Sequence, residues 1–454
     1  MSARSRIGIG IGMCAMVSLL GSNVVFAEAP AAAPTGTVQE RLDALEKKSD
    51  APGLWKTLGF QLSGGVSVSY NHNFNNPNTN LSQLYTHNAN TNTFTPNLAQ
   101  LMLQRAADPE GRGAERAGFR ARLNFGSDAR TSRARTNYLG GTSNDEIDVQ
   151  ELYAEYIVPG TSLKINAGKM NTLLGYETFT SWENPNFMRT FNYNLAQAFT
   201  NTGLRLTYVV SPMATMTAAV YNGLDNIDDN NKGKIWEGSL TLTLHPRIIN
   251  YFYGSWGPEQ TNGLTGSTFG TCTQGAPGCD PSAKRTELDY ILTLKPTDTD
   301  TVIVEVHYGN ETNTVLTTAA SGGVGAHSKS GNARWDAVVA YFIHDFNDQT
   351  QPNAFSLRLR GELFEDASGT RTCSGVVGVN AGNNTCAGAT QSGPAIQTPQ
   401  TIWSPVVTLQ YAPVPSLITR TEFAYAKSDK NVFLHGSDPV NNQETLTFNV
   451  VYLF

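Results

Sequence analysis

The chain has 454 residues, of which 40% are hydrophobic and only 15% are charged. Because charged residues make up about 25% of a typical soluble protein, a large soluble enzyme fits this composition poorly. After residue 27 no stretch supplies the ~20 consecutive apolar residues of a membrane-spanning helix, which excludes a bundle of such helices. The composition suits a chain whose apolar residues alternate with polar ones, as in a transmembrane β-barrel.

The first 27 residues have the features of a secretory signal peptide. Two basic residues near the start precede the apolar stretch 7–20, and small residues at Val25 and Ala27 suit cleavage before Glu28. An N-terminal anchor helix is the alternative, although glycines interrupt the apolar stretch. The remaining chain keeps all 38 acidic residues and loses two of the 32 basic ones, which gives a net charge of −8. That balance argues against nucleic-acid binding, which needs a basic surface.

Residues 28–57 are predicted to form a periplasmic linker followed by a short helix. The linker is rich in Pro and Ala, and the helix places Val38, Leu42 and Leu45 at the spacing of a coiled-coil seam. One and a half heptads are too short to be stable alone. The helix is therefore either a frayed periplasmic segment or a small oligomerisation stalk.

Residues 58–454 are dominated by an alternation of apolar and polar side chains with a period of two. In residues 446–454, for example, every second residue is a large apolar one. This pattern predicts half-buried β-strands. Sixteen segments carry it, and we predict an all-β, antiparallel transmembrane barrel with strands at 58–70, 92–105, 117–126, 147–158, 162–171, 202–210, 214–222, 234–244, 248–257, 284–295, 299–309, 331–344, 352–365, 401–411, 416–428 and 443–454.

The connections between these strands alternate between short and long. Short turns occur near 159–161, 211–213, 245–247, 296–298, 345–349 and 413–415, whereas long polar connections lie near 172–201, 223–233, 258–283, 310–331, 366–400 and 429–442. Outer-membrane barrels have this asymmetry, with short periplasmic turns and long extracellular loops. The second strand contains Pro96, and its prediction rests on the up-and-down parity of the barrel as much as on its pattern.

Aromatic residues near the strand ends predict contact with outer-membrane lipid. Tyr and Trp favour the membrane interface, and ten of them are assigned to an outward girdle: Trp236, Tyr251, Tyr253, Tyr290, Tyr308, Trp335, Trp403, Tyr411, Tyr425 and Tyr452. The last strand ends on Phe454, which resembles the C-terminal signature of outer-membrane barrels. The resemblance implies that the barrel-assembly machinery recognises this residue.

A barrel of sixteen strands is too wide for side chains to fill, which predicts an aqueous channel lined by polar residues. The alternation points basic side chains inward at Arg120, Arg122, Lys164, Arg205, Arg358, Arg360 and Arg420. It points acidic ones inward at Glu151, Glu155, Glu237, Glu287, Asp289, Glu305, Asp336, Glu362 and Glu422. Most of the basic residues fall on one side of the closed barrel and many of the acids on the other, so a transverse field across the pore is expected.

The connection at 172–201 differs from the others because it contains about nine aromatic or large apolar residues. Such residues are costly on a free external loop. We expect this loop to fold into the lumen and narrow the pore, with Glu177, Glu183 and Arg189 at the constriction. An external lid packed on its neighbours is the alternative.

The cysteines predict local disulfides in an oxidising compartment. After removal of the signal peptide, Cys272 and Cys279 bracket one loop, and Cys373 and Cys386 bracket another. The spacing does not suit a zinc site, and the seven histidines are scattered, so no metal or other cofactor is predicted. The acidic segment 224–231 could hold Ca²⁺ through Asp225, Asp228 and Asp229, although a solvated loop fits its spacing better. No catalytic motif is found, and no enzyme is predicted.

Residues 120–257 resemble the OmpL-like family of β-barrel porins. The matching features, in order, are VQELY at 149–153, INAGK at 165–169, GYE at 175–177, NP at 184–185, GLRL at 203–206 and VYNGLD at 220–225. The resemblance implies an outer-membrane diffusion channel, with a homotrimer as its expected assembly. The sequence therefore predicts a porin for small hydrophilic solutes or ions. A surface structural or adhesive barrel acting through its loops is the alternative.

Overall fold

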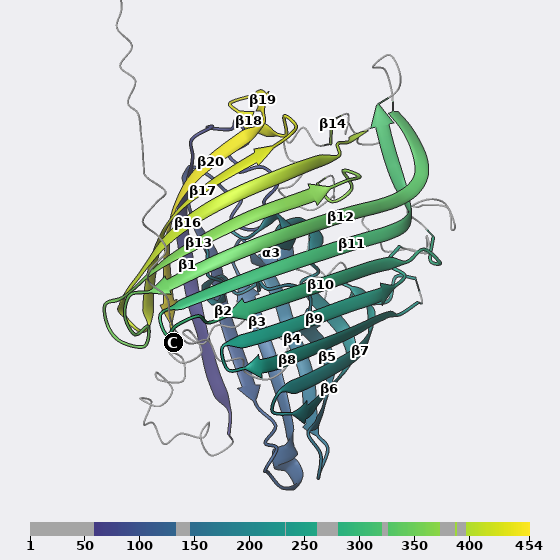
Figure 1. Ribbon diagram of the computed structural model, residues 1–454, viewed down its shortest axis with the longest axis vertical. Coiled ribbons are helices and arrows are strands. Elements are labelled where there is room, and N and C mark those ends of the chain that lie inside the picture. Colours follow the sequence, from purple (N-terminus) through teal and green to yellow (C-terminus); the bar gives the residue numbers. More distant parts are fainter. Residues whose placement is uncertain are drawn as a thin grey trace, which may run out of the picture.

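The computed structural model is dominated by one large closed β-barrel (Figure 1). It describes residues 59–132, 146–231, 233–260, 280–319, 326–372, 386–387 and 396–454. Sixteen antiparallel strands close in the order β1 to β13, then β16, β17 and β20, and two small two-stranded sheets lie outside this ring. The predicted fold, including its number of strands, is confirmed.

The barrel strands have the bounds β1 (Gln61–Asn73), β2 (Thr93–Arg105), β3 (Ala117–Phe125), β4 (Ile147–Ile157), β5 (Leu163–Asn171), β6 (Thr200–Ser211), β7 (Ala214–Leu224), β8 (Ile235–His245), β9 (Ile248–Gly257), β10 (Arg285–Leu294), β11 (Asp300–Ala319), β12 (Ala326–Asp345), β13 (Ala354–Asp366), β16 (Gln400–Val414), β17 (Leu417–Ser428) and β20 (Asn442–Leu453). The small sheets pair β14 (Cys386–Ala387) with β15 (Ile396–Gln397), and β18 (Phe433–His435) with β19 (Asp438–Val440).

Helical segments are short and lie between strands. They are η1 (Gly113–Arg116), α3 (Ala129–Ser132), η2 (Ser181–Glu183) and a π-helical turn η3 (Asn192–Ala196). Within the described ranges, no helix is long and apolar enough to cross a membrane. Residues 1–58 lie outside the described part of the chain, so the signal peptide and the segment 28–57 stay predictions.

Strand β16 shows how alternation builds the two faces of the wall. Val407, Leu409 and Tyr411 are 40–44% exposed on the outside, whereas Thr408 and Gln410 between them are buried on the inside. Side chains alternate between the faces of a strand because its period is two residues. The apolar exterior suits lipid, and the polar interior leaves room for a filled or wet lumen.

Two local features fix the register of the strands near the point where the barrel closes. Strand β1 pairs with β20, and Gly64 exchanges two backbone hydrogen bonds with Phe454, at 2.9 and 3.1 Å. A Cβ on Gly64 would lie 2.1 Å from the carbonyl oxygen of Gln100, so only glycine fits this approach. Strand β2 contains Pro96 as predicted, and the register shift beside it leaves Asn97 as an unpaired bulge residue that accommodates the proline.

The hairpin of β11 and β12 corrects one predicted boundary. Each strand has 20 residues, and the register continues to Ala319 opposite Ala326. The long connection expected at 310–331 is therefore wrong, because most of its residues belong to the paired strands. The β-branched and apolar residues of the segment 314–318 favour extended backbone, which explains why the ladder continues.

Four residues face the side of the wall opposite to the one predicted. Trp335, Tyr251 and Tyr253 are 0–5% exposed and pack inside the barrel, so they do not belong to an outward girdle. Asp336 faces outward and forms an ion pair with Arg334 at 2.8 Å. The inward indole of Trp335 fits because residue 309 on β11 is glycine. A Cβ there would lie 1.9 Å from Nε1 of Trp335.

Candidate functional site in the barrel lumen

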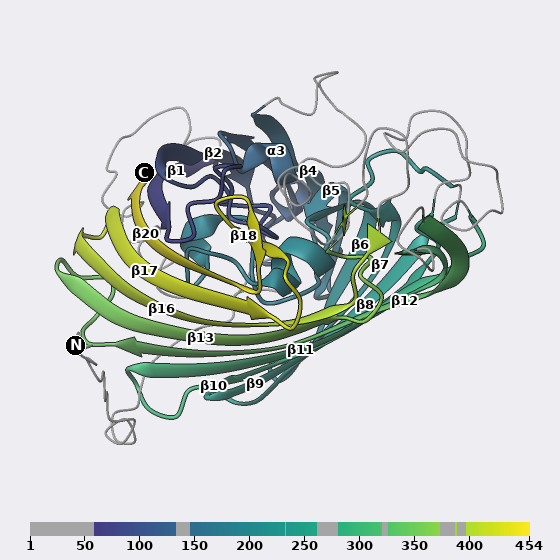
Figure 2. The same ribbon diagram turned by 90° about the horizontal axis from the view of Figure 1, so that it is seen from above.

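The connection between β5 and β6, residues 172–199, lies inside the barrel and is called loop L3 below. The view from above shows its helical turns enclosed by the wall (Figure 2). Its large apolar side chains are almost fully buried, with Phe187 and Met188 at 0%, Phe191 at 1% and Trp182 at 3% exposure. The geometry agrees with the inward fold expected from the sequence rather than with an external lid.

Loop L3 packs against the wall on several sides of the lumen. Near its start, Leu173 and Tyr176 join a cluster with inward residues of β9 to β12. Further along, Phe179 and Trp182 pack against inward residues of β2, β17 and β20. Two strands separate β12 from β17 on one side of the barrel and six separate β2 from β9 on the other, so L3 reaches across the lumen between the two contact regions.

Arginines of β13 and β17 bind the backbone of L3. Arg358 donates to the carbonyl oxygen of Pro185 at 3.1 Å, and Arg420 donates to those of Ser181 and Asn184 at 3.0 and 3.1 Å. Arg360 donates to the carbonyl oxygen of Met188. All three arginines are buried to at least 94%, so their inward orientation agrees with the sequence while their charges are covered by the loop.

Carboxylates of the same two strands bind the neighbouring N–H groups. Glu422 accepts hydrogen bonds from the amides of Phe187 and Met188, both at 2.7 Å. Glu362 accepts from the amides of Phe191 and Asn192 at 2.8 and 2.7 Å. We call these five wall residues, Arg358, Arg360, Glu362, Arg420 and Glu422, the clamp. Charge-assisted bonds of this kind are roughly twice as strong as neutral ones.

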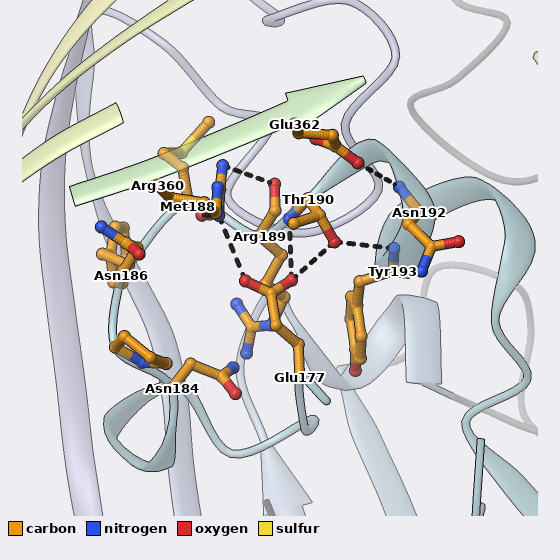
Figure 3. Close-up of polar contacts among 12 residues, drawn as sticks. Glu177, Asn184, Asn186, Met188, Arg189, Thr190, Asn192, Tyr193, Arg360 and Glu362 are labelled. Atoms are coloured by element: carbon orange, nitrogen blue, oxygen red, sulfur yellow. Dashed lines mark hydrogen bonds and ion pairs between the residues drawn. The ribbon is translucent and has the colours of Figure 1, made fainter. Parts of the chain in front are cut away.

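Inside L3, Glu177 connects the loop to the clamp. Its carboxylate forms an ion pair with Arg360 at 3.1 Å and accepts from both the amide and the hydroxyl of Thr190 at 2.8 Å (Figure 3). Arg189 donates to the carbonyl oxygen of Thr178 at 3.4 Å and lies 3.8 Å from Asp128. Two of the three predicted constriction residues, Glu177 and Arg189, are thus buried within the loop and stabilise its shape.

Glu183, the third predicted constriction residue, is only half-buried. Thr178 donates its hydroxyl to it at 3.1 Å. Burial raises the pKa of the Glu183 carboxyl, and the nearby Arg122 opposes that rise. Among the three constriction residues, Glu183 is therefore the one placed to meet solvent in the lumen.

A second loop enters the lumen, which the sequence did not reveal. Residues 74–92, called loop L1, bury Leu84, Tyr85 and His87 to at least 99%. The side-chain oxygen of Asn194 in L3 accepts from the amides of Thr86 and His87 at 3.0 and 3.1 Å. The one sequence feature that could have indicated a folded loop here is its richness in asparagine. Four asparagines of L1 adopt positive φ, a conformation that Asn tolerates well.

The last long loop completes this inner core. In residues 429–441, called loop L8, Val432 and Phe433 are at most 1% exposed. They share one apolar cluster with Tyr85 of L1, Phe191 of L3 and Trp335 of the wall. Three loops therefore pack together on the β12–β17 side of the lumen.

The wall from β3 to β6 carries charges that are paired with one another. Glu151 accepts Arg122 at 3.0 Å and Arg120 at 3.6 Å, and Lys169 pairs with Asp148 at 3.1 Å. The other predicted pore residues of this wall, which are named next, point inward or lie near the end of a strand. Glu155 accepts from the amide of Ala107 at 2.6 Å, Arg205 donates to the hydroxyl of Tyr221 at 2.7 Å, and Lys164 is half-buried.

The wall from β8 to β11 is different because its acids have few partners. Glu237, Glu287, Asp289 and Glu305 are each at most 5% exposed. Within the described part of the chain, none of the four is in an ion pair. These four residues are called the acidic sector below. The acids expected on β8, β10 and β11 thus lie on one wall, whereas three of the arginines expected opposite them bind L3.

The other predicted sites have separate outcomes. Asp225 accepts from the amides of Phe199 and Thr200 at 2.7 and 3.0 Å, and Asp229 pairs with Lys234, so both bind protein groups. Among the residues the structure describes, no group of three His, Cys, Asp or Glu residues could hold a metal ion. Cys272, Cys279 and Cys373, and the side chain of Cys386, lie outside the described part, so both disulfides stay predictions.

The closed sixteen-strand barrel, with its apolar exterior and an inward loop, defines the class of outer-membrane porins. The family "Putative beta-barrel porin-2, OmpL-like" matches residues 59–454, and the chain belongs to this family. It is therefore a channel-forming barrel of the bacterial outer membrane, as predicted. None of the curated proteins matches the sequence significantly.

Three solved structures of outer-membrane channels align with this chain at low sequence identity. The anion-selective porin from Comamonas acidovorans aligns with a TM-score of 0.52 and 8% identity, over 87% of this chain and 99% of its own. The outer-membrane channel DcaP of Acinetobacter baumannii aligns at 0.49 and 12%, over 87% and 97%. OprB of Pseudomonas putida aligns at 0.48 and 11%, over 94% and 100%.

Proposed function

We propose that this porin is a restricted channel for the passive diffusion of ions and small hydrophilic solutes. The observation that carries the proposal is that L3 crosses the lumen and is fixed to the wall by the clamp. The clamp binds both N–H groups and carbonyl oxygens of L3, which fixes the loop in the lumen. A loop fixed in this way narrows the water-filled cross-section that a sixteen-strand barrel would otherwise have. Permeating molecules must then pass beside the loop, along the wall sectors that it leaves uncovered.

Conductance of the purified protein in a planar bilayer tests this function. We expect stepwise openings, and we expect liposomes containing the protein to admit small sugars faster than large ones. Replacing residues 181–192 of L3 by a short Gly/Ser linker should increase the single-channel conductance and weaken the size dependence. If the wild-type barrel never opens and the linker variant does, the three packed loops close it, and the surface role acting through the loops becomes the better explanation.

We further propose the assembly and maturation that the family resemblance implies. The protein is exported, loses residues 1–27, and forms a homotrimer in the outer membrane. Support comes from the signal-like N-terminus and from the broad apolar exterior, which suits both lipid and neighbouring barrels. Mass spectrometry of the native complex tests the trimer. N-terminal sequencing should start at Glu28, and peptide mapping without reduction should recover the pairs Cys272–Cys279 and Cys373–Cys386.

A further inference from the structure

The inner wall of the barrel is covered by loops on one side and partly open on the other. Every inward side chain is buried from Ala354 to Asp366 on β13 and from Gln400 to Ala412 on β16. On β3 and β4, by contrast, the inward residues Arg120, Tyr153 and Glu155 are only half-buried, and the side chain of Arg120 is 27% exposed. Water within the described part of the lumen therefore reaches the wall of β3 and β4 but not that of β13 and β16.

Loop L3 separates these two sides of the lumen. Its segment 173–182 crosses from the wall of β9 to β12, where Leu173 packs, to the wall of β17, β20 and β2, where Trp182 packs. The apolar cluster of L1, L8 and the wall from β12 to β17 lies on one side of this crossing segment, and the wall from β3 to β8 lies on the other. The half-buried Glu183 directly follows the crossing segment. An ion that uses the open side of the lumen therefore passes between this part of L3 and the wall from β3 onward.

The crossing segment meets this wall at Thr180. Its side-chain oxygen accepts from Gln100 of β2 at 3.2 Å and from Arg122 of β3 at 3.3 Å. On β3, Arg120 is the next inward residue toward the periplasmic end, and it is partly exposed. The narrowest point of the passage is therefore at Thr180, and Arg120 borders it. Hydrogen bonds to a hydroxyl are weaker than those to the carboxylates of the clamp, so L3 separates from the wall here more readily than at the clamp.

Two partly exposed side chains of opposite charge border this passage. Arg120 donates through Nε to Gln104 at 3.0 Å. Its nearest carboxylate, that of Glu151, lies 3.6 Å away and binds Arg122 more closely, at 3.0 Å. On the other side, Glu183 belongs to none of the ion pairs that the described residues form, although Arg122 and Arg120 act on it electrostatically. Both charges are therefore only partly compensated at a place that water reaches.

We propose that ions and small polar solutes pass between the crossing segment of L3 and the wall from β3 onward, and that Arg120 and Glu183 are the charged residues that they contact. This inference rests on the proposed channel function and identifies its route and its selectivity residues. The acidic sector takes no part, because its side chains are at most 5% exposed. Since the two contact residues carry opposite charges, the passage admits both cations and anions and discriminates chiefly by size.

Reversal potentials of the full-length protein in a planar bilayer, under a tenfold KCl gradient, test the two contact residues. We expect a permeability ratio of K⁺ to Cl⁻ close to one for the wild type. Arg120→Gln should raise the ratio and Glu183→Gln should lower it, each by about threefold, which is the effect of a unit charge roughly 6 Å from an ion in water after screening by salt. The matched control is Arg334→Gln, which removes a basic residue on the exterior and should leave the ratio unchanged.

Thiol labelling tests the route independently of charge. Arg120→Cys should react with methanethiosulfonate ethylsulfonate, and the attached group should lower the single-channel conductance. Ser356→Cys is the matched control, because Ser356 faces inward near the periplasmic end of β13 but is 0% exposed, and it should not react. Wild-type protein treated in the same way accounts for the thiols of the native cysteines.

The outcomes separate the route from the channel function. If either charge variant keeps the wild-type ratio, or if Ser356→Cys is labelled and Arg120→Cys is not, the proposed route is wrong while the channel function stands. A wild-type protein without any openings would contradict both. Folded variants are recognised by their unchanged heat-modifiable migration on a denaturing gel. Tyr153→Cys, at the half-buried position in register with Arg120, provides the labelling site if Arg120→Cys does not assemble.

Discussion

The ion pair between Arg360 and Glu177 should control how firmly L3 is held. The side chains are 0% and 1% exposed, and their charged atoms lie 3.1 Å apart. Arg360→Met removes the guanidinium and keeps most of the apolar stem. Among the described residues, Thr190 is then the only one that donates to the buried carboxylate of Glu177, and the carbonyl oxygen of Met188 loses the hydrogen bond from Arg360. We expect L3 to open locally more often while the barrel itself stays closed.

The magnitude follows from the cost of an uncompensated buried charge. Removing one partner of a buried ion pair costs about 3–5 kcal/mol. Adding Glu177→Gln to Arg360→Met removes the stranded charge and keeps an oxygen that can accept from Thr190. The second change should therefore recover about 2 kcal/mol, which lies within the usual range of coupling energies between contacting residues. The double variant should be more stable than the single variant Arg360→Met.

Hydrogen exchange of the L3 amides, measured by mass spectrometry in detergent micelles, reports this local opening. A loss of about 3 kcal/mol corresponds to roughly hundredfold faster exchange of the amides of Met188 and Thr190. Arg334→Met is the matched control. It breaks two exterior ion pairs, with Asp336 and with Glu365, each worth only about 0–1 kcal/mol, and should leave these amides unchanged. Exchange less than about threefold faster in Arg360→Met, or faster still in the double variant, would refute the reasoning.

Four further predictions concern packing, pH dependence and assembly. Gly309→Ala should lower the temperature at which the barrel unfolds on a denaturing gel, because its Cβ would meet the buried indole, whereas Gly361→Ala, with open space at its Cβ, should not. Burial raises the pKa of Asp128 to about 6, because it favours the protonated carboxyl. The contribution of Asp128 to stability is therefore present in acid and is lost as the pH rises through 6, and Asp128→Asn should abolish this pH-dependent contribution. Burial lowers the pKa of His87 well below its usual value, so the contribution of its neutral ring to stability is lost as the pH falls below about 6.5. In exchange measurements from pH 7.5 to 5, the L1 amides of His87→Gln should therefore be better protected in acid than those of the wild type. Deletion of Phe454 should reduce the amount of folded barrel in the outer membrane, measured by membrane fractionation, because it removes two hydrogen bonds that close the barrel.

The barrel could be predicted from the sequence because its signal is local and repeated. A period of two residues specifies which side chains face lipid, and the alternation of short and long connections specifies the topology. Even the strand interrupted by Pro96 was recoverable, since an antiparallel barrel with both termini on one side needs an even number of strands. The extra length of β11 and β12 was not recoverable in this way, because the polar residues at 310–313 and 327–331 interrupt the alternation and resemble a loop.

The filling of the lumen could be predicted only in part. The apolar content of L3 indicated an inward fold, but the inward position of Trp335 depends on a glycine of the neighbouring strand, which no local pattern connects to it. The inward fold of L1 depends on the side chain of Asn194 in L3 and on the apolar surface that L3 and L8 provide. These contacts join segments that lie far apart in the sequence, so hydropathy along one segment carries no signal for them.

Ion selectivity in such a barrel cannot be inferred from the number of inward charges. The sequence places Arg358, Arg360 and Arg420 on the inner face, which by itself suggests a basic wall that attracts anions. The structure uses all three to bind carbonyl oxygens of L3, and Arg360 is further neutralised by Glu177. A charged side chain that holds a loop is fixed in direct contact with its partner. It acts on a permeating ion only through the part of its charge that the partner does not neutralise. By binding these three arginines, the loop therefore also covers the basic charges that the inner face would otherwise present to the lumen, and an inward charge read from the alternation is no measure of the charge that an ion meets.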